Sequence, residues 1–256
     1  MNSENSVAIV TGAGVGIGFE IAKQLALKKT KVLLNDIDPI LAEKACKQIR
    51  DLGGVCEFSA GDVSELSVIE NLVELAVQHF GKLDIVVANA GITTFGNFFE
   101  YQPESFEKLM KLNLFGTYFL TQYAAKQMVK QQSGGRILLM SSVTGHLAHA
   151  NLAAYGMTKA AIEQLAKNLV VDLSPHQITI NSVAPGATLT ERTLEDVDYL
   201  KTWSRITPMN KPATVQDIAA AALFFASPEA GHITGQHLVI DGGWTSVGVS
   251  PYIINS

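Results

Sequence analysis

The sequence predicts an α/β fold in which helices cover both faces of one parallel sheet. Short β-branched apolar runs recur along the 256 residues, and helix-length segments with apolar residues three and four positions apart separate them. The runs lack a polar residue at every second position, which is typical of strands buried on both faces. Since strands that alternate with helices along a whole chain form parallel sheets, we expect a doubly wound sheet in a single domain.

The apolar runs define the expected elements. Two long apolar helices are predicted over Phe115 to Val129 and Ala153 to Leu173. The stretch from Ala187 to Pro212 has neither helical nor strand spacing, and we expect a substrate loop or lid at about 187–212 because long irregular loops often close over ligands. The predicted strands cover Val7 to Val10, Val32 to Leu34, Ile85 to Ala88, Ile137 to Met140, Ile178 to Val183 and Leu238 to Ile240.

Composition excludes several classes of protein. The net charge is −5 and 47% of the residues are apolar, so the chain is neither disordered nor a basic nucleic-acid or membrane-surface binder. Its two cysteines, Cys46 and Cys56, lack metal-site spacing and are predicted to be reduced thiols. The first residues lack the basic start and apolar stretch of a signal peptide, and the longest apolar run is shorter than the ~20 residues of a membrane span. We expect a cytoplasmic protein without nucleic-acid or membrane partners.

A glycine-rich turn follows the first predicted strand and precedes a helix. The segment reads Thr11-Gly-Ala-Gly-Val-Gly-Ile-Gly18. Glycines let the backbone approach a pyrophosphate, and the N–H groups and dipole of the helix N-terminus attract it. The spacing fits Thr-Gly-x-x-x-Gly-x-Gly through Gly12, Gly16 and Gly18. The sequence therefore predicts a dinucleotide site here.

Asp36 ends the second predicted strand and favours NAD over NADP. A carboxylate at this position accepts hydrogen bonds from the adenosine ribose hydroxyls and repels a 2′-phosphate. Val15 and Ile37 stand where a basic residue would neutralise that phosphate. The alternative is that Asp36 only caps the next helix, but Asp38 followed by Pro39 is the better cap.

Polar residues gather at the predicted carboxyl ends of the strands. Tyr155 and Lys159 share one helix face, and an ammonium beside a phenol favours the phenolate, so the pair can exchange a proton with a carbonyl or alcohol. Ser142 and the segment Asn89-Ala90-Gly91 each follow a predicted strand. Since ligands bind where parallel strands end, these segments and the glycine turn are expected to form one crevice.

With these motifs the chain resembles a short-chain dehydrogenase/reductase of the single-domain subgroup. The likeness runs from the Thr11 motif through Asn113 and Pro185-Gly186 to Asp241-Gly-Gly243. It implies a Rossmann-type fold with seven parallel strands. It also implies a hydride transfer between the substrate carbon and nicotinamide, with Tyr155 as acid–base.

The resemblance implies a role for each matching residue. Lys159 would favour the Tyr155 phenolate and hold the nicotinamide ribose, Ser142 would polarise the substrate carbonyl, and Asn113 would anchor a proton-relay water. Position 188 departs from the family, which usually has an aliphatic residue where this chain has Thr188. The implied cofactor contacts are Gly12, Val15, Gly16, Ile17, Gly18, Asp36, Asp62, Val63, Asn89, Ala90, Gly91, Tyr155, Lys159, Pro185, Gly186, Thr188 and Thr190.

Four residues are candidates for substrate contact, each with a structural alternative. Thr94 is a candidate wall residue. His146 and His149 lie in the loop between Ser142 and Tyr155, where they would bind a polar substrate or be solvated or structural histidines. We expect no metal site, because no acidic residue or cysteine accompanies these histidines in the sequence. Trp203 would close over substrate or act as a packing anchor.

The favoured function is an NAD-dependent dehydrogenase of secondary alcohols such as sugars, polyols or hydroxy acids. A 3-oxoacyl-thioester reductase shares the same catalytic residues, but carrier-protein reductases usually have arginine where this chain has His176. A non-catalytic nucleotide sensor would be expected to lack one of Asn113, Ser142, Tyr155 and Lys159. From the resemblance we also expect a homotetramer built on the two long helices and the C-terminal segment.

Overall fold

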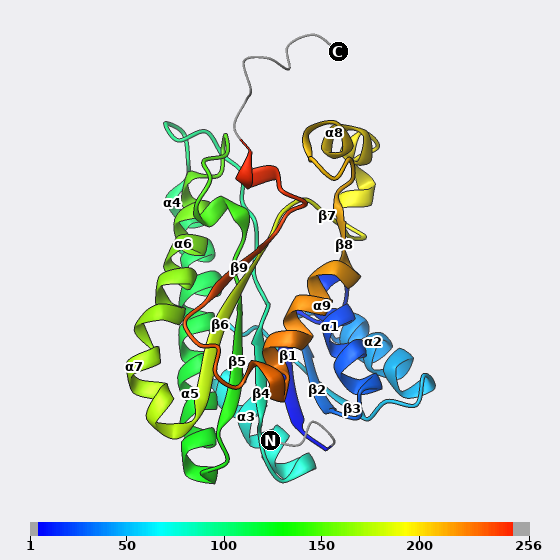
Figure 1. The fold of residues 1–256 in the computed structure, drawn as a ribbon, viewed down its shortest axis with the longest axis vertical. Coiled ribbons are helices and arrows are strands. Elements are labelled where there is room, and N and C mark those ends of the chain that lie inside the picture. Colours follow the sequence, from blue (N-terminus) through cyan, green and yellow to red (C-terminus); the bar gives the residue numbers. More distant parts are fainter. Residues whose placement is uncertain (1–4, 248–256) are drawn as a thin grey trace.

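Seven parallel strands form the central sheet, in the order β3-β2-β1-β4-β5-β6-β9 (Figure 1). The computed structural model describes residues 5–247. The strand order reverses between β1 and β4, which is where ligands bind in doubly wound sheets. The strands are β1 (Val7–Thr11), β2 (Lys31–Asp36), β3 (Cys56–Ala60), β4 (Ile85–Ala88), β5 (Gly135–Met140), β6 (Ile178–Pro185) and β9 (His237–Ile240).

Helices cover both faces of this sheet, as the sequence predicts (Figure 1). Helices α1 (Gly16–Leu27), α2 (Pro39–Asp51) and α9 (Val215–Ala226) pack on one face, and their apolar residues form one core with the strands. Helices α3 (Leu66–Phe80), α5 (Thr117–Gln131) and α6 (Ala153–Asn168) form a second core on the other face. The predicted α/β fold is confirmed.

Helix α4 (Pro103–Met110) continues into α5 through a π-helical turn, η1 (Lys111–Gly116). The predicted helix from Phe115 therefore begins earlier than expected. The predicted helix from Ala153 to Leu173 is divided, because α6 ends at Asn168 and α7 (Val170–Leu173) follows. The short 3-10 turns are η2 (Val143–Gly145), η3 (Ser174–His176), η4 (Thr193–Glu195), η5 (Pro228–Ala230) and η6 (Trp244–Ser246).

The edges of the sheet depart from the prediction. Strand β3 was not among the expected runs because only Cys56 in it is buried. Strand β9 was expected to be buried on both faces, which is wrong, since Leu238 is 39% exposed. Both strands lie at an edge of the sheet and pair with one neighbour only.

The segment from 187 to 212 is more regular than its sequence suggests. It contains β7 (Thr188–Leu189), η4 and α8 (Tyr199–Ile206), and β7 pairs with β8 (Ala213–Thr214) just beyond it. Helix α8 lies at the top of the molecule, beyond the carboxyl ends of the strands (Figure 1). The role of this segment as a lid stays a prediction.

Local signals in the sequence set several boundaries. Asp38 caps α2 by accepting hydrogen bonds from the N–H groups of Ile40 and Leu41, with Pro39 in the first turn, as predicted. Cys46 and Cys56 are free thiols buried in the core. Between residues 5 and 247, no helix has the length and apolarity to cross a bilayer. Part of the N-terminal segment without signal-peptide features (1–4) and the end of the C-terminal segment (248–256) fall outside the described residues.

Candidate active site

The glycine turn is packed so closely that side chains are excluded at Gly12 and Gly18. Gly12 has a φ of +59°, and a Cβ there would lie 2.8 Å from Cα of Ala90. A Cβ on Gly18 would overlap the carbonyl oxygen of Gly12 and the amide nitrogen of Asn89. Bare backbone at a helix N-terminus is what a pyrophosphate requires, so the turn fits a dinucleotide. Val15 immediately precedes α1, and Ile17 packs against the core.

Asn89 holds the glycine turn in place. Its side-chain amide donates hydrogen bonds to the carbonyl oxygens of Thr11 and Gly12, each at 2.9 Å. In return, the Thr11 hydroxyl accepts from the backbone N–H groups of Asn89 and Ala90, each at 3.2 Å. The Asn89 side chain therefore links β1 to β4.

A cavity of about 770 Å³ opens beside this turn at the switch point of the sheet. Asp36 lies on it and is only 9% exposed. Its Oδ2 accepts a hydrogen bond from the Gly14 N–H at 2.9 Å, and its Oδ1 accepts from the Asp38 N–H at 3.1 Å. The structure thus brings seven predicted cofactor residues to one cavity: Gly12, Asp36, Asp62, Val63, Asn89, Ala90 and Gly91.

The opposite wall of the cavity was missed by sequence reasoning. Glu104, Glu107 and Lys108 of α4 line it together with Lys111. Lys111 pairs with Glu65, and this hydrogen bond raises the pKa of Lys111. Nothing in the sequence of α4 marks these residues, because their position depends on how η1 aims the helix.

Asn113 lies in η1 and is fully buried. Its Oδ1 accepts a hydrogen bond from the Ile92 N–H at 2.9 Å, and its Nδ2 donates to the Ile92 carbonyl at 3.0 Å and to Thr158 Oγ1 at 3.2 Å. Thr158 in turn donates to the Tyr155 carbonyl at 2.7 Å. Asn113 therefore connects the segment after β4 to the helix that carries Tyr155. π-Helical turns of this kind are frequent at functional sites.

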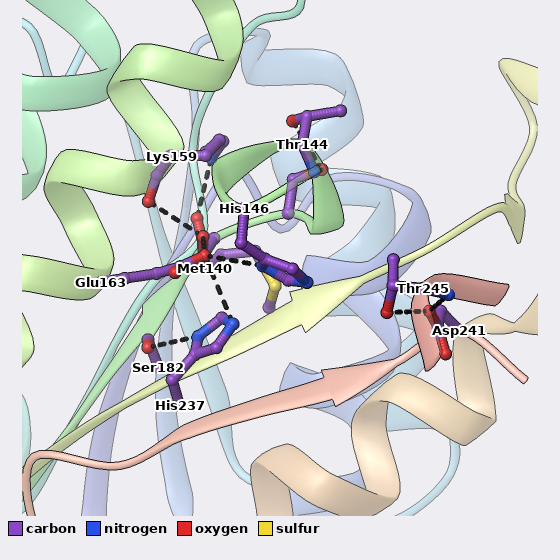
Figure 2. A network of polar contacts seen from close by, with 11 residues as sticks. Met140, Thr144, His146, Lys159, Glu163, Ser182, His237, Asp241 and Thr245 are labelled. Atoms are coloured by element: carbon purple, nitrogen blue, oxygen red, sulfur yellow. Dashed lines mark hydrogen bonds and ion pairs between the residues drawn. The ribbon is translucent and has the colours of Figure 1, made fainter. Parts of the chain in front are cut away.

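Tyr155 and Lys159 share one face of α6. The Lys159 ammonium lies 5.5 Å from the centroid of the Tyr155 ring. It donates a hydrogen bond to the Met140 carbonyl at 2.7 Å, and Lys159 is 4% exposed (Figure 2). A Cβ on Gly91 would lie 3.6 Å from Lys159 Nζ. The ammonium is thus placed between the phenol and the cavity segment after β4.

Ser142 follows β5 and begins η2. Its Oγ accepts hydrogen bonds from the Thr144 N–H at 3.3 Å and from Thr144 Oγ1 at 3.1 Å. In residues 5–247 its own hydroxyl hydrogen has no acceptor, so it is available to a bound carbonyl or alcohol oxygen. This arrangement leaves Ser142 as a positioned donor.

The segment after β6 lies over the glycine turn. Thr190 and Glu191 are the groups nearest to a Cβ built on Gly16, each 3.7 Å away. Gly186, after Pro185, has no room for a side chain, because a Cβ there would lie 2.6 Å from Cβ of Asp241. The Thr188 N–H donates to the hydroxyl of Tyr199 at 3.0 Å. Burial raises the pKa of Tyr199, which keeps this hydroxyl protonated.

The remaining candidates were expected either to contact substrate or to have a structural role. Trp203 packs edge-on against Trp244, with ring centroids 4.9 Å apart, which favours the packing anchor. His149 is exposed, and its Nδ1 is 2.9 Å from the Ala150 carbonyl. Thr94 makes a short hydrogen bond with the Tyr101 hydroxyl.

His146 has an acidic neighbour in the fold. The sequence suggested that no acidic residue accompanies this histidine, and that reason for expecting no metal site is wrong. Glu163 of α6 lies between His146 and His237 of β9 (Figure 2). Glu163 Oε1 is 3.6 Å from His146 Nδ1 and 3.3 Å from His237 Nε2. The sequence hides this cluster because its members come from three separate elements.

Comparison with known proteins shows that the chain is similar to a large group of oxidoreductases. The family described as "Enoyl-(Acyl carrier protein) reductase" matches residues 12–245. An uncharacterized oxidoreductase of Thermotoga maritima is 38% identical over 96% of this chain and 100% of its own length. An L-rhamnose 1-dehydrogenase (NAD(P)(+)) of Sphingomonas is 34% identical over 94% of this chain and 96% of its own.

Solved structures agree. A 7α-hydroxysteroid dehydrogenase complexed with NADH and 7-oxo glycochenodeoxycholic acid superposes with a TM-score of 0.89. It is 34% identical, and the match covers 94% of each chain. The fold, the chain length and the oxidoreductase relatives all indicate the same family.

Proposed function

This chain belongs to the short-chain dehydrogenase/reductase family, and from that premise we propose that it is an NAD-dependent dehydrogenase of small polar secondary alcohols. The observation that carries the proposal is the position of the Lys159 ammonium, 5.5 Å from the Tyr155 ring centroid and beside the cavity segment. The coarser statement, that the chain is an oxidoreductase of CH–OH groups, follows from the family and its named relatives.

Asp36 supports NAD as the proposed cofactor. Its carboxylate lies on the cavity wall, and neighbouring Ile37 is exposed and carries no charge to bind a 2′-phosphate. A fixed negative charge here repels that phosphate and accepts hydrogen bonds from ribose hydroxyls. Gly12, Gly16 and Gly18 would hold the pyrophosphate, and Lys159 would hold the nicotinamide ribose.

The side chains supply the proton chemistry of the proposed reaction. When bound, the nicotinamide accepts or donates the hydride at the substrate carbon. Tyr155 would exchange the proton at the substrate oxygen, with the Lys159 ammonium 5.5 Å from its ring centroid. Ser142 donates its free hydroxyl hydrogen to the same oxygen, a contribution worth about 3 kcal/mol in comparable sites. Asn113, fixed by its bonds to Ile92 and Thr158, would position the relay water.

A screen of NADH production tests the proposal. Sugars, polyols, hydroxy acids and steroids are offered with NAD and with NADP, and Tyr155→Phe serves as the blank. We expect turnover with a polar alcohol and NAD, at least a thousandfold slower in Tyr155→Phe, while NADH fluorescence shows unchanged cofactor binding. Near-wild-type turnover in that variant overturns the assignment.

Reduction of a 3-oxoacyl thioester is the second candidate. The description of the matching family, which names an acyl-carrier-protein reductase, favours it. His176, exposed in η3, weakens it, because a basic arginine patch for an acidic carrier protein is missing at that position. Turnover of a short 3-oxoacyl thioester with NADPH above that of any alcohol with NAD would select it.

The domain organisation, location and assembly of the protein are also proposals. We infer a single cytoplasmic cofactor-binding domain that assembles as a homotetramer through α5 and α6. Tyr118 on α5 and Met157 on α6 support this, because these large side chains are 44% and 50% exposed on the two helices. Sedimentation of a stable monomer would contradict the assembly.

A further inference from the structure

We propose that His146, Glu163 and His237 form a binding site for one divalent transition-metal ion of the zinc class. The ion would hold the loop that Ser142 begins against α6 and β9. Three elements meet in this cluster: the end of η2, the middle of α6 and the first residue of β9 (Figure 2). Their donor atoms all lie within 4.8 Å of one another.

Two of the three donor–donor distances are close to those of a zinc site. Zinc binds histidine nitrogen and carboxylate oxygen at about 2.0–2.1 Å in tetrahedral geometry, which places neighbouring donor atoms about 3.3 Å apart. Glu163 Oε1 is 3.3 Å from His237 Nε2 and 3.6 Å from His146 Nδ1. The His146 side chain is 33% exposed and packs edge-on against the His237 ring, and in the proposed site it would turn its Nδ1 toward the ion, with water as the fourth ligand.

His237 supplies an independent observation. Its Nε2 is buried and makes no hydrogen bond within residues 5–247, although Glu163 Oε1 is 3.3 Å away. A buried polar atom without a partner is costly, and an ion between nitrogen and oxygen accounts for it. The other ring nitrogen, Nδ1, lies 3.0 Å from Ser182 Oγ. When Nδ1 donates to that hydroxyl, Nε2 carries the lone pair that a metal needs.

The surrounding groups prepare Glu163 and the loop. Ser141 Oγ donates to Glu163 Oε1 at 2.8 Å, which orients the carboxylate and leaves its oxygen a second lone pair. A Cβ on Gly145 would overlap Glu163 Oε1, so glycine is required for the loop to approach the carboxylate.

Two nitrogens and one oxygen select the metal class. Imidazole with a carboxylate suits zinc and its first-row neighbours, whereas magnesium and calcium prefer oxygen alone. The site adjoins the loop that Ser142 begins, because Ser141 and Gly145 both approach Glu163. We therefore assign the ion a positioning role: it would hold the loop against the helix that carries Tyr155 and Lys159.

Zinc titration of the full chain tests the site directly. The protein carries no polyhistidine tag, is stripped with a chelator and is titrated by calorimetry in a non-coordinating buffer. We expect one zinc per chain, and affinity at least about a hundredfold weaker in Glu163→Gln and His237→Gln. The control His149→Gln, in the same loop outside the cluster, should bind like wild type. Absent stoichiometric binding in wild type, or unchanged affinity in both cluster variants, overturns the proposal.

A second variant guards against misfolding, since Glu163 and His237 are mostly buried. His146→Gln changes a partly exposed ring, and circular dichroism should show a wild-type fold. Cobalt added to wild type should give the intense visible bands of a four-coordinate site, and His146→Gln should lack them. A hundredfold excess of zinc over its Kd should raise the wild-type Tm by about 5 °C and leave that of His146→Gln unchanged. Identical spectra and Tm shifts in the two proteins would overturn the site.

Discussion

The Tyr199 hydroxyl lies 3.0 Å from the Thr188 backbone nitrogen and accepts its hydrogen bond. Thr188 is one of the residues proposed to contact the nicotinamide. Tyr199, on α8, therefore occupies an amide that the cofactor is expected to use. If Thr188 contacts the cofactor as proposed, this hydrogen bond would couple cofactor binding to the position of α8.

Tyr199→Phe should tighten cofactor binding. The variant leaves the Thr188 amide unpaired in the free protein, so the cofactor no longer displaces a bond worth about 1 kcal/mol, and its Kd should fall about fivefold. Titration of NADH fluorescence measures this. Phe keeps the ring that packs 6.0 Å from Trp203, so the comparison isolates the hydroxyl. An unchanged or weaker Kd would contradict the coupling.

Asp36→Ala should abolish the preference for NAD. The carboxylate is proposed to accept two ribose hydrogen bonds, so we expect NADH affinity to fall about tenfold or more, while NADPH affinity falls less or rises. The measurement is the ratio of the two Kd values.

Asp38→Ala is the matched control. It removes the cap of α2 and should lower the free energy of unfolding by about 1 kcal/mol without moving that ratio. A shift of equal size in both variants would show that the effect is structural.

Gly18→Ala should destabilise the protein although alanine favours helices. The propensity gain in α1 is about 1 kcal/mol. The added methyl overlaps the Gly12 carbonyl and the Asn89 amide, so the turn must shift at a cost of about 2 kcal/mol or more. A lowered Tm with a much larger NADH Kd is the expected result, and retention of both wild-type values would refute the packing described for this turn.

Asp241 should make the stability of the folded protein depend on pH. Burial raises the pKa of its carboxyl, but hydrogen bonds from Thr245 and Gly243 outweigh burial and hold the pKa below its ordinary value. Because the folded pKa lies below the unfolded one, the stabilisation is complete above about pH 4 and is lost as pH falls through the folded pKa.

Thermal melts of Asp241→Asn against wild type measure this dependence. The Tm gap should be a few degrees at pH 7 and should narrow below about pH 4. The exposed Asp51→Asn serves as control and should show no gap at either pH. A gap for Asp241→Asn that stays constant down to pH 2 would mean that the carboxylate charge plays no part.

Sequence patterns predicted the features that depend on interactions within one short segment of the chain. The Thr11–Gly18 turn, the Asp38 cap and the Tyr155–Lys159 spacing each lie within one short segment, where sequence distance and spatial distance agree. The buried central strands were found for the same reason. Strand β3 was missed because its half-buried residues alternate too weakly to distinguish an edge strand from a loop.

Long-range packing decides what was missed. The Tyr199 bond to Thr188 depends on how α8 folds back over the sheet. Glu163 contacts His237 only because β9 pairs with β6. No residue near Glu163 in the sequence indicates that pairing. The acidic and basic wall from α4 is likewise fixed by a neighbouring turn rather than by its own sequence.

The π-helical turn Lys111–Gly116 places Asn113 outside regular α-helical winding. Hydrogen bonds in such a turn run from residue i to residue i+5, so it takes in one residue more than a turn of α-helix. Deleting one residue there would restore regular winding and leave α4 and α5 in register, so Glu104, Glu107 and Lys108 would keep their places on the cavity. Asn113 would lose the geometry of its hydrogen bonds to Ile92. A one-residue deletion would therefore remove the proposed relay position and leave the rest of the helix where it is.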